Sequence, residues 1–321
     1  MTLEADEVTL LARASFDGEA LAARHPPKLQ DANKKLIHAI ATPVRGQIEV
    51  TRWKAGSLPA RVPSRACEWK SQAGVFDYAA AAPGSVAWHV NFADANLFYA
   101  YGSGLFAQDE HQVAEHPVLA SLRESLVAEP IAGLVPLTTE GERATPVLVK
   151  GAERSCAIAT SRGGRSIYGN AMHRATLETI RSLVARLDPA TVSNILAMEA
   201  PAGGSGRYSP AEISTVVSTA FTGFTAARLE SQGASVVIHT GHWGCGAYGG
   251  NHRLMALLQL LAARLAQLDT LVFHTFDAAG AAAYVEAREH ADRLVVSGAL
   301  VGELFWQIDD LGYRWGSSDG N

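Results

Sequence analysis

The sequence predicts an α/β protein in which a mixed, largely central sheet lies between layers of helices, with helical decoration at the N-terminus. Four β-type apolar runs each come before a segment of helical pattern, an alternation typical of layered α/β domains. These runs occupy residues 86–92, 194–200, 234–240 and 270–276. The chain has 321 residues, of which 48% are hydrophobic and 18% are charged, so it can bury a large core.

The first quarter of the chain lacks this alternation. It contains one helical pattern at 29–41, followed by a stretch from 56 to 84 that is rich in Pro, Gly, Ser and Ala. We therefore expect residues 1–84 to form a helical and irregular covering segment, and residues 85–321 to form the principal domain.

The helices expected in the principal domain follow the four runs in order. The first covers about 108–127 with a break at Pro117, because proline cannot continue a helix interior. The second begins at Ser209-Pro210-Ala211-Glu212, where an N-cap, a first-turn proline and a glutamate at the third helical position coincide. The others are expected at 254–268 and 278–290.

Charge and cysteine content restrict the partners and the compartment. With 27 Lys and Arg against 32 Asp and Glu, the net charge is −5, which argues against binding duplex nucleic acid through its phosphates. Three widely spaced cysteines provide neither a disulfide framework nor a four-cysteine zinc site, which fits a reducing compartment. The acidic first residues do not resemble a secretory signal, and the most apolar stretch is interrupted by polar residues. We expect a cytoplasmic protein with no membrane partner.

A glycine-rich loop at 240–250 follows the third run and begins the next helix. Such loops direct backbone N–H groups and a helix N-terminus toward an anion. Three of its glycines, beginning at Gly244, also satisfy G-x-G-x-x-G, so a dehydrogenase dinucleotide site is one alternative. The acidic residue which that motif requires is misplaced, because Asp269 begins the next strand and Asp277 lies too far on. A loop that serves only helix–strand packing is another alternative.

Two adjacent carboxylates, Asp109 and Glu110, begin the helix after the first run. Carboxylates in the first turn ordinarily stabilise a helix, so a purely structural role as caps is one interpretation. The functional interpretation is a glycosidase-type acid. Neighbouring helical side chains diverge by about 100°, so one carboxylate would be the acid and the other would brace it.

Together these stretches resemble the poly(ADP-ribose) glycohydrolase family, whose macrodomain core contains T-G-N-W-G-C-G-A-F-G-G-D. Residues 91–110 are similar to its catalytic loop, in which V-D-F-A-N leads through three glycines to Q-E-E. Further core segments are similar at 197–201, 220–224, 254–259 and 273–276. The resemblance covers about 86–276. It implies a macrodomain-like fold and a glycoside hydrolase that acts on ADP-ribose or a related nucleotide-ribose substrate.

The resemblance also implies roles for individual residues. Glu110 matches the acid–base glutamate of the family and Asp109 replaces the glutamate before it. Residues 244–248 match the diphosphate loop, with Tyr248 beside the distal ribose, and Phe276 matches the phenylalanine that stacks on adenine. The expected ligand-binding residues are Asn91, Asp94, Phe98, Tyr99, Gln108, His242, Gly244, Cys245, Gly246, Ala247, Tyr248 and Phe276.

The chain departs from the family pattern in its catalytic loop, where Phe98, Tyr99 and Ala100 stand in place of the three glycines. In the family those glycines let the backbone approach the diphosphate and terminal ribose. We expect the two aromatic side chains to occupy or reshape that space, so that the protein processes poly(ADP-ribose) poorly and takes an altered ligand.

Other departures lie at single positions. Asn91 replaces an aspartate, Asp94 replaces a ribose-binding asparagine and His242 replaces the asparagine before tryptophan. The tyrosine-rich segment that clasps adenine has no clear counterpart around 155–160.

No metal or cofactor is expected. His239 and His242 are three residues apart at a strand end and should point to opposite sides, and Cys245 is expected to be a small packing residue. The expected partner is an ADP-ribose-type small molecule or an ADP-ribosylated substrate. Two other functions stay open: a non-catalytic ADP-ribose-binding module in which Glu110 is only a cap, and an enzyme of small-molecule nucleotide metabolism that reuses the fold.

Overall fold

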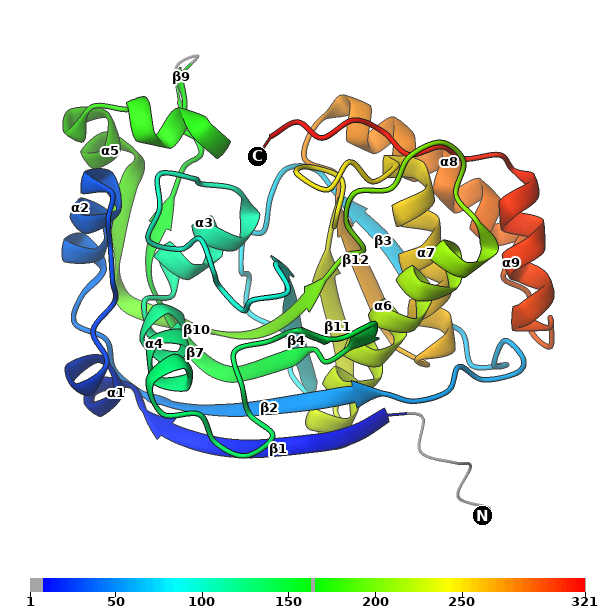
Figure 1. Cartoon of the computed structure of the whole chain (residues 1–321), viewed down its shortest axis with the longest axis horizontal. Coiled ribbons are helices and arrows are strands. Elements are labelled where there is room, and N and C mark those ends of the chain that lie inside the picture. The colour runs from blue at the N-terminus through cyan, green and yellow to red at the C-terminus, as the bar shows by residue number, and fades with distance from the viewer. Residues whose placement is uncertain (1–7, 163–164, 321) are drawn as a thin grey trace.

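The computed structural model describes residues 8–162 and 165–320. An eight-stranded sheet in the order β1-β2-β7-β10-β4-β11-β12-β3 forms its centre (Figure 1). Neighbours from β1 to β10 pair antiparallel, and neighbours from β10 to β3 pair parallel. The strands are β1 (Val8–Asp17), β2 (Gln47–Ala55), β3 (Glu68–Gln72), β4 (Ser85–Ala93), β7 (Val147–Ile158), β10 (Val184–Glu199), β11 (Ser235–Thr240) and β12 (Thr270–His274).

Two short pairs lie outside this sheet, and helices cover both of its faces (Figure 1). The short strands are β5 (Thr139–Glu140), β6 (Arg143–Ala144), β8 (Ser161–Arg162) and β9 (Arg165–Ser166). On one side lie α1 (Gly18–Arg24), α2 (Ala32–Ala41), α3 (Gln108–Glu115), α4 (Val118–Ala128), the 3₁₀ helix η1 (Gly169–Arg174) and α5 (Leu177–Leu183). On the other lie α6 (Pro210–Glu230), α7 (His252–Leu265), α8 (Ala278–Leu294) and α9 (Val301–Asp310).

The buried core divides at the sheet because side chains alternate along each strand. On β10, Leu196 and Met198 pack into the cluster under α6 and α7. Ile195 and Ala197 face the opposite way and pack into the cluster under α4. The predicted class, an α/β protein with a mixed sheet between helical layers, is confirmed.

The helix boundaries expected from local signals are also observed. Ser209 caps α6, and Glu212 returns the interaction by accepting a hydrogen bond from the Ser209 N–H at 2.8 Å. The helical stretch expected at 108–127 is α3 and α4, and it breaks before Pro117 as predicted.

The expectation of a helical and irregular segment over 1–84 needs correction, because three strands of the central sheet come from it. β1 and β3 are the two edge strands, and an edge strand buries too little surface to carry a clear apolar pattern. β2 lies inside the sheet, but Glu49, Arg52 and Lys54 interrupt its apolar residues. The boundary expected at residue 84 stays a prediction.

The parallel half of the sheet determines where a ligand can bind. The strands β4, β10, β11 and β12 run in the same direction, so the loops that follow their carboxyl ends meet at one edge of the sheet. No helix among the described residues has both the length and the apolar character needed to cross a bilayer.

Candidate functional site

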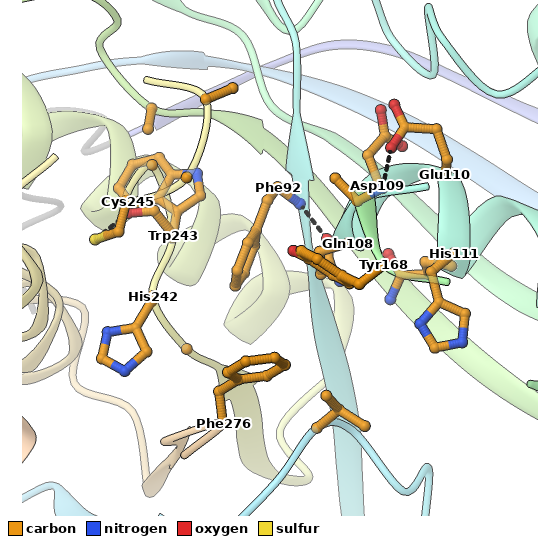
Figure 2. Close-up of a pocket in the computed structure, with 18 of the residues that line it drawn as sticks. Phe92, Gln108, Asp109, Glu110, His111, Tyr168, His242, Trp243, Cys245 and Phe276 are labelled. Carbon is orange, nitrogen blue, oxygen red and sulfur yellow. Dashed lines mark hydrogen bonds between the residues drawn. The ribbon is translucent and has the colours of Figure 1, made fainter. Parts of the chain in front are cut away.

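A pocket of about 430 Å³ lies at this edge of the sheet (Figure 2). Its wall includes the loop after β4, the first turn of α3, the glycine loop 241–250 and the loop after β12. Most of the predicted site residues line it: Asp94, Tyr99, Gln108, Asp109, Glu110, His242, Gly244, Cys245, Gly246, Ala247, Tyr248 and Phe276. Two predicted residues, Asn91 and Phe98, are not among the described residues of the wall.

The two adjacent carboxylates form one wall of the pocket. Asp109 is 6% exposed and Glu110 is 4% exposed, so both are nearly withdrawn from water. Asn91 Nδ2 donates to Asp109 Oδ1 at 3.0 Å, and Glu110 Oε2 accepts from the Ala107 N–H at 2.9 Å. Glu110 therefore caps α3 through one oxygen while its carboxyl group lines the pocket.

Burial dominates the electrostatics of this wall. It raises the pKa of Asp109 well above its ordinary value, and the neighbouring Glu110 raises it further, while Asn91 and Lys34 act in the opposite direction. Lys34 is itself buried, and burial lowers its pKa to about 8 despite Glu110 and Asp109. Its Nζ donates to the Tyr101 carbonyl at 2.8 Å. We therefore expect Asp109 to keep its proton at neutral pH.

Stability should accordingly depend on pH through Asp109. A pKa that is raised in the folded state means that the folded protein holds a proton which the unfolded chain releases. The contribution of Asp109 to stability is therefore fully present in acid and is lost as the pH rises from about 4 through neutrality.

Asp109→Asn removes this titration, and the new amide can still accept the hydrogen bond from Asn91. Between about pH 5 and about pH 8, the unfolding free energy of the variant should fall less than that of the parent. Chemical denaturation of both proteins at several pH values measures this difference. Parallel stability curves would contradict the assigned protonation of Asp109.

Gln108 joins the first turn of α3 to the end of β4. Its Oε1 accepts from the Phe92 N–H at 2.8 Å, and its Nε2 donates to the Val90 carbonyl at 3.0 Å. Both ends of the amide are thus bonded to the backbone of β4. The geometry favours an anchoring role for Gln108 over direct recognition of a ligand.

Asn91 and Phe98, which were expected to contact the ligand, do not line the pocket. Asn91 is completely buried and reaches the site only through its hydrogen bond to Asp109. Phe98 is completely buried in the hydrophobic cluster under α4. Its backbone has a φ of 54°, in the region that favours glycine, and this turns the ring into the core. Motif spacing could not give the direction of its side chain.

The next two residues, Tyr99 and Ala100, do line the pocket. Tyr99 is 66% exposed, and the Arg123 guanidinium lies 5.5 Å from the centre of its ring. Of the two aromatic residues expected to occupy the site, only Tyr99 therefore adds bulk there.

The glycine loop faces the carboxylates from the opposite wall (Figure 2). Gly244 has a φ of 75°, and a Cβ there would lie 2.5 Å from the Ala200 Cβ. Trp243 is buried and its Nε1 donates to the Met198 carbonyl at 3.0 Å, which attaches the loop to β10. The loop is thus held rigidly with its backbone against the pocket.

Two of the predicted ribose contacts pair with each other. The Tyr248 hydroxyl donates to Asp94 Oδ2 at 3.0 Å. Because Tyr248 belongs to the glycine loop and Asp94 follows β4, this hydrogen bond joins two segments that border the pocket.

Phe276 and Tyr168 provide an aromatic end to the pocket (Figure 2). Phe276 is 53% exposed, and its ring centre lies 5.9 Å from that of Tyr168. Tyr168 was not predicted, because the resemblance places the tyrosine-rich segment that clasps adenine around 155–160, where this chain has no aromatic residue. An aromatic residue directly before Gly169 and the 3₁₀ helix is the signal that could have identified it. An exposed ring and a half-buried ring at this spacing favour a flat, aromatic ligand group.

The histidines near the glycine loop separate into two groups, as their spacing predicted. His239 stacks on His89 and lies 3.0 Å from His274 Nε2 through its Nδ1. His242 turns toward the pocket, where its ring centre lies 4.7 Å from that of His252.

Comparison with known proteins identifies a family model that matches residues 134–283, described as poly(ADP-ribose) glycohydrolase, macro domain fold. Similar solved structures have low identity. The poly(ADP-ribose) glycohydrolase of Thermomonospora curvata bound to the inhibitor ADP-HPD is 16% identical, with 85% of this chain and 84% of that chain covered and a TM-score of 0.45. That of Deinococcus radiodurans in complex with ADP-ribose is 13% identical, with 88% and 95% covered and a TM-score of 0.43. The Oceanobacillus iheyensis macrodomain with MES bound is 12% identical, with 65% and 86% covered and a TM-score of 0.38.

Proposed function

We propose that this chain, a macrodomain-like protein of the poly(ADP-ribose) glycohydrolase family, is a glycoside hydrolase that acts on ADP-ribose or a related nucleotide-ribose substrate. One observation carries the proposal: two buried carboxyl groups, on Asp109 and Glu110, face a rigid glycine loop across a single pocket. That arrangement combines an acid with backbone N–H groups that can bind an anion.

The walls of the pocket match the parts of such a substrate in order. Backbone N–H groups of the glycine loop favour a diphosphate, because they offer several donors without a competing side chain. Phe276 and Tyr168 favour the adenine ring at one end. A ribose attached to the diphosphate then lies toward Glu110, where its glycosidic oxygen can receive a proton.

The chemistry requires a single residue that changes its role. Glu110 donates its proton to the leaving ribose oxygen as the glycosidic C–O bond breaks, and an oxocarbenium-like sugar results. Its carboxylate then accepts a proton from the water that attacks the anomeric carbon. Oε2 is held by the Ala107 N–H, which leaves Oε1 for this transfer. Asp109, held by Asn91, braces the neighbouring acid.

Calorimetric titration with ADP-ribose, together with a product assay on ADP-ribosylated protein and on poly(ADP-ribose), tests the proposal. Saturable binding with release of ADP-ribose supports it. Binding without turnover of either substrate would contradict hydrolysis and identify a binding module. Neither binding nor turnover would contradict the assigned ligand and favour an enzyme of small-molecule nucleotide metabolism.

The binding module is the second candidate because Glu110 has a sufficient structural reason to be present. Its carboxylate accepts the Ala107 N–H at the start of α3, and such a cap is stabilising without any catalysis.

Tyr99 should limit which substrates are accepted. Its exposed ring borders the pocket where a polymer would pass, so Tyr99→Ala should increase hydrolysis of poly(ADP-ribose) several-fold relative to the parent. Phe98 is kept, because truncation of a buried phenylalanine costs about 3–5 kcal/mol and would obscure the result.

Trp306→Ala is the matched control, since Trp306 on α9 is 65% exposed and does not line the pocket. Rates on the polymer and affinity for ADP-ribose are measured for the three proteins together. If Tyr99→Ala lowered both the rate on the polymer and the affinity for ADP-ribose, Tyr99 would instead be a ligand contact.

A further inference from the structure

Three side chains that the proposed hydrolysis does not use meet beside the pocket. His242 and Cys245 belong to the glycine loop, and His252 is the first residue of α7. One possible ligand atom from each lies within 4.8 Å of the other two. His242 and Cys245 lie on the opposite side of the pocket from Asp109 and Glu110 (Figure 2).

The His242 ring packs edge-on against Phe273, but this contact does not account for its two nitrogens. Both of its ring nitrogens are shielded from water, and neither has a hydrogen-bond partner of standard geometry among the residues that the structure describes. The Thr275 backbone lies close and favours protonation of the ring, but burial outweighs it and lowers the pKa of His242 to about 4. At neutral pH the ring is therefore a neutral imidazole, the form that binds metal ions.

Cys245 and His252 would add a sulfur donor and a second nitrogen donor to the cluster. Cys245 is buried with its Sγ 3.7 Å from the Trp243 carbonyl, and burial raises the pKa of its thiol. A buried thiol of this kind is unreactive alone but is deprotonated outright by a coordinating cation. His252 is exposed, so it is free to turn toward an ion. Burial lowers the pKa of His252, while Asp277 and Asp319 act in the opposite direction.

We propose that His242, Cys245 and His252 form a Zn²⁺ site at the rim of the pocket, with its fourth coordination position open to the pocket. Two imidazoles and a thiolate suit zinc, and three protein ligands with one open position are typical of zinc sites that bind a further molecule. Tetrahedral zinc separates such donors by about 3.3–3.8 Å. The cluster therefore needs only a small closing movement, which the exposed His252 can provide.

The open position has a chemical consequence that rests on the proposed function. Because the three residues line the same pocket as the glycine loop, a phosphate oxygen of the ligand can complete the coordination. The ion would hold the diphosphate and take no part at the glycosidic bond, which lies toward Glu110.

Metal binding by the purified full chain tests the site without any activity assay. Equilibrium dialysis against Zn²⁺ should load one equivalent on the parent. His252→Ala and Cys245→Ala should lose it, while His173→Ala, which removes another exposed histidine outside the cluster, should keep it. Replacement of zinc by Co²⁺ should give a thiolate-to-cobalt charge-transfer band that Cys245→Ala abolishes.

His252→Ala removes an exposed side chain, so it should fold normally, and circular dichroism checks this. His242→Asn provides a second variant of similar size. A parent that binds no zinc, or folded variants that bind it as well as the parent, would overturn the site.

A second measurement addresses the open position. ADP-ribose added to the Co²⁺ form should change the visible d–d bands, because a phosphate oxygen enters the coordination shell. ADP-ribose binding that leaves these bands unchanged would overturn the phosphate contact, while the zinc site and the proposed function would each stand on their own measurements.

Discussion

Replacing Glu110 with glutamine should lower turnover of an ADP-ribose substrate by about 10²-fold or more while leaving ligand affinity nearly unchanged, since this is the usual scale of general acid–base catalysis. Glutamine keeps the size of the side chain and a carbonyl oxygen that can accept the Ala107 N–H, so α3 stays capped. The variant lacks the carboxyl proton that Glu110 is proposed to transfer to the leaving ribose oxygen. Measurement of kcat alongside the dissociation constant of ADP-ribose separates the two effects.

Two further variants separate the proposed catalytic role of Glu110 from its structural role as a cap. Asp109→Asn should reduce turnover less, because Asp109 only braces the acid and its hydrogen bond to Asn91 can persist. Glu110→Ala removes the cap as well and should reduce stability by about 0.5–2 kcal/mol. Turnover by Glu110→Gln at the parent rate would remove this residue from the mechanism.

Gly244→Val should produce the largest structural effect, a loss of about 2–5 kcal/mol in unfolding free energy together with loss of ADP-ribose binding. Gly244 has a positive φ that a β-branched residue rarely adopts, and its missing Cβ would lie 2.5 Å from the Ala200 Cβ. To avoid this collision, either the segment at Ala200 must move away from the glycine loop or the loop must leave its position against the pocket. Chemical denaturation and calorimetric titration measure the two losses.

Gly233→Val is the matched control, because Gly233 has a φ of 85° but no atom within 4 Å of its Cβ position. This variant has the same backbone strain but no collision, so its unfolding free energy should fall by only about 1–2 kcal/mol. Its binding of ADP-ribose should be unchanged. Equal losses in both variants would show that the loop is not closely packed at Gly244. Gly246 is the weaker choice for such a test, since its φ lies outside the positive region.

Burial inside the sheet helped the sequence to predict a strand but was not sufficient, because the interior strands β2 and β7 contain charged residues among their apolar ones and were not expected. The strands β4, β10, β11 and β12 lie inside the sheet between helical layers, so their apolar runs are nearly continuous and easily recognised. The edge strand β3, with the sequence Glu-Trp-Lys-Ser-Gln, has no such run, and its existence depends on pairing with β12. Local pattern does not contain that information.

The same limit applies to the site. The acid pair and the glycine loop each follow a strand of the parallel half, so their meeting at one edge could be predicted from topology alone. The burial of Phe98 depends on one backbone angle, and the approach of Tyr168 and His252 depends on how distant segments pack. No spacing in the chain encodes those contacts.

We expect the hydrogen bond between Tyr248 and Asp94 to make the pocket selective for hydroxyl groups. A ligand that enters between these side chains must replace a satisfied donor and a satisfied acceptor, so one new contact alone gains almost nothing over the bond it breaks. A group that offers only an acceptor leaves Asp94 Oδ2 without its hydrogen bond, although Oδ1 still accepts from the Asn96 N–H at 2.8 Å. A group that offers only a donor leaves the Tyr248 hydroxyl without an acceptor. A hydroxyl can donate to Asp94 and accept from Tyr248 at the same time, so we expect the pair to favour a sugar hydroxyl over a deoxy position.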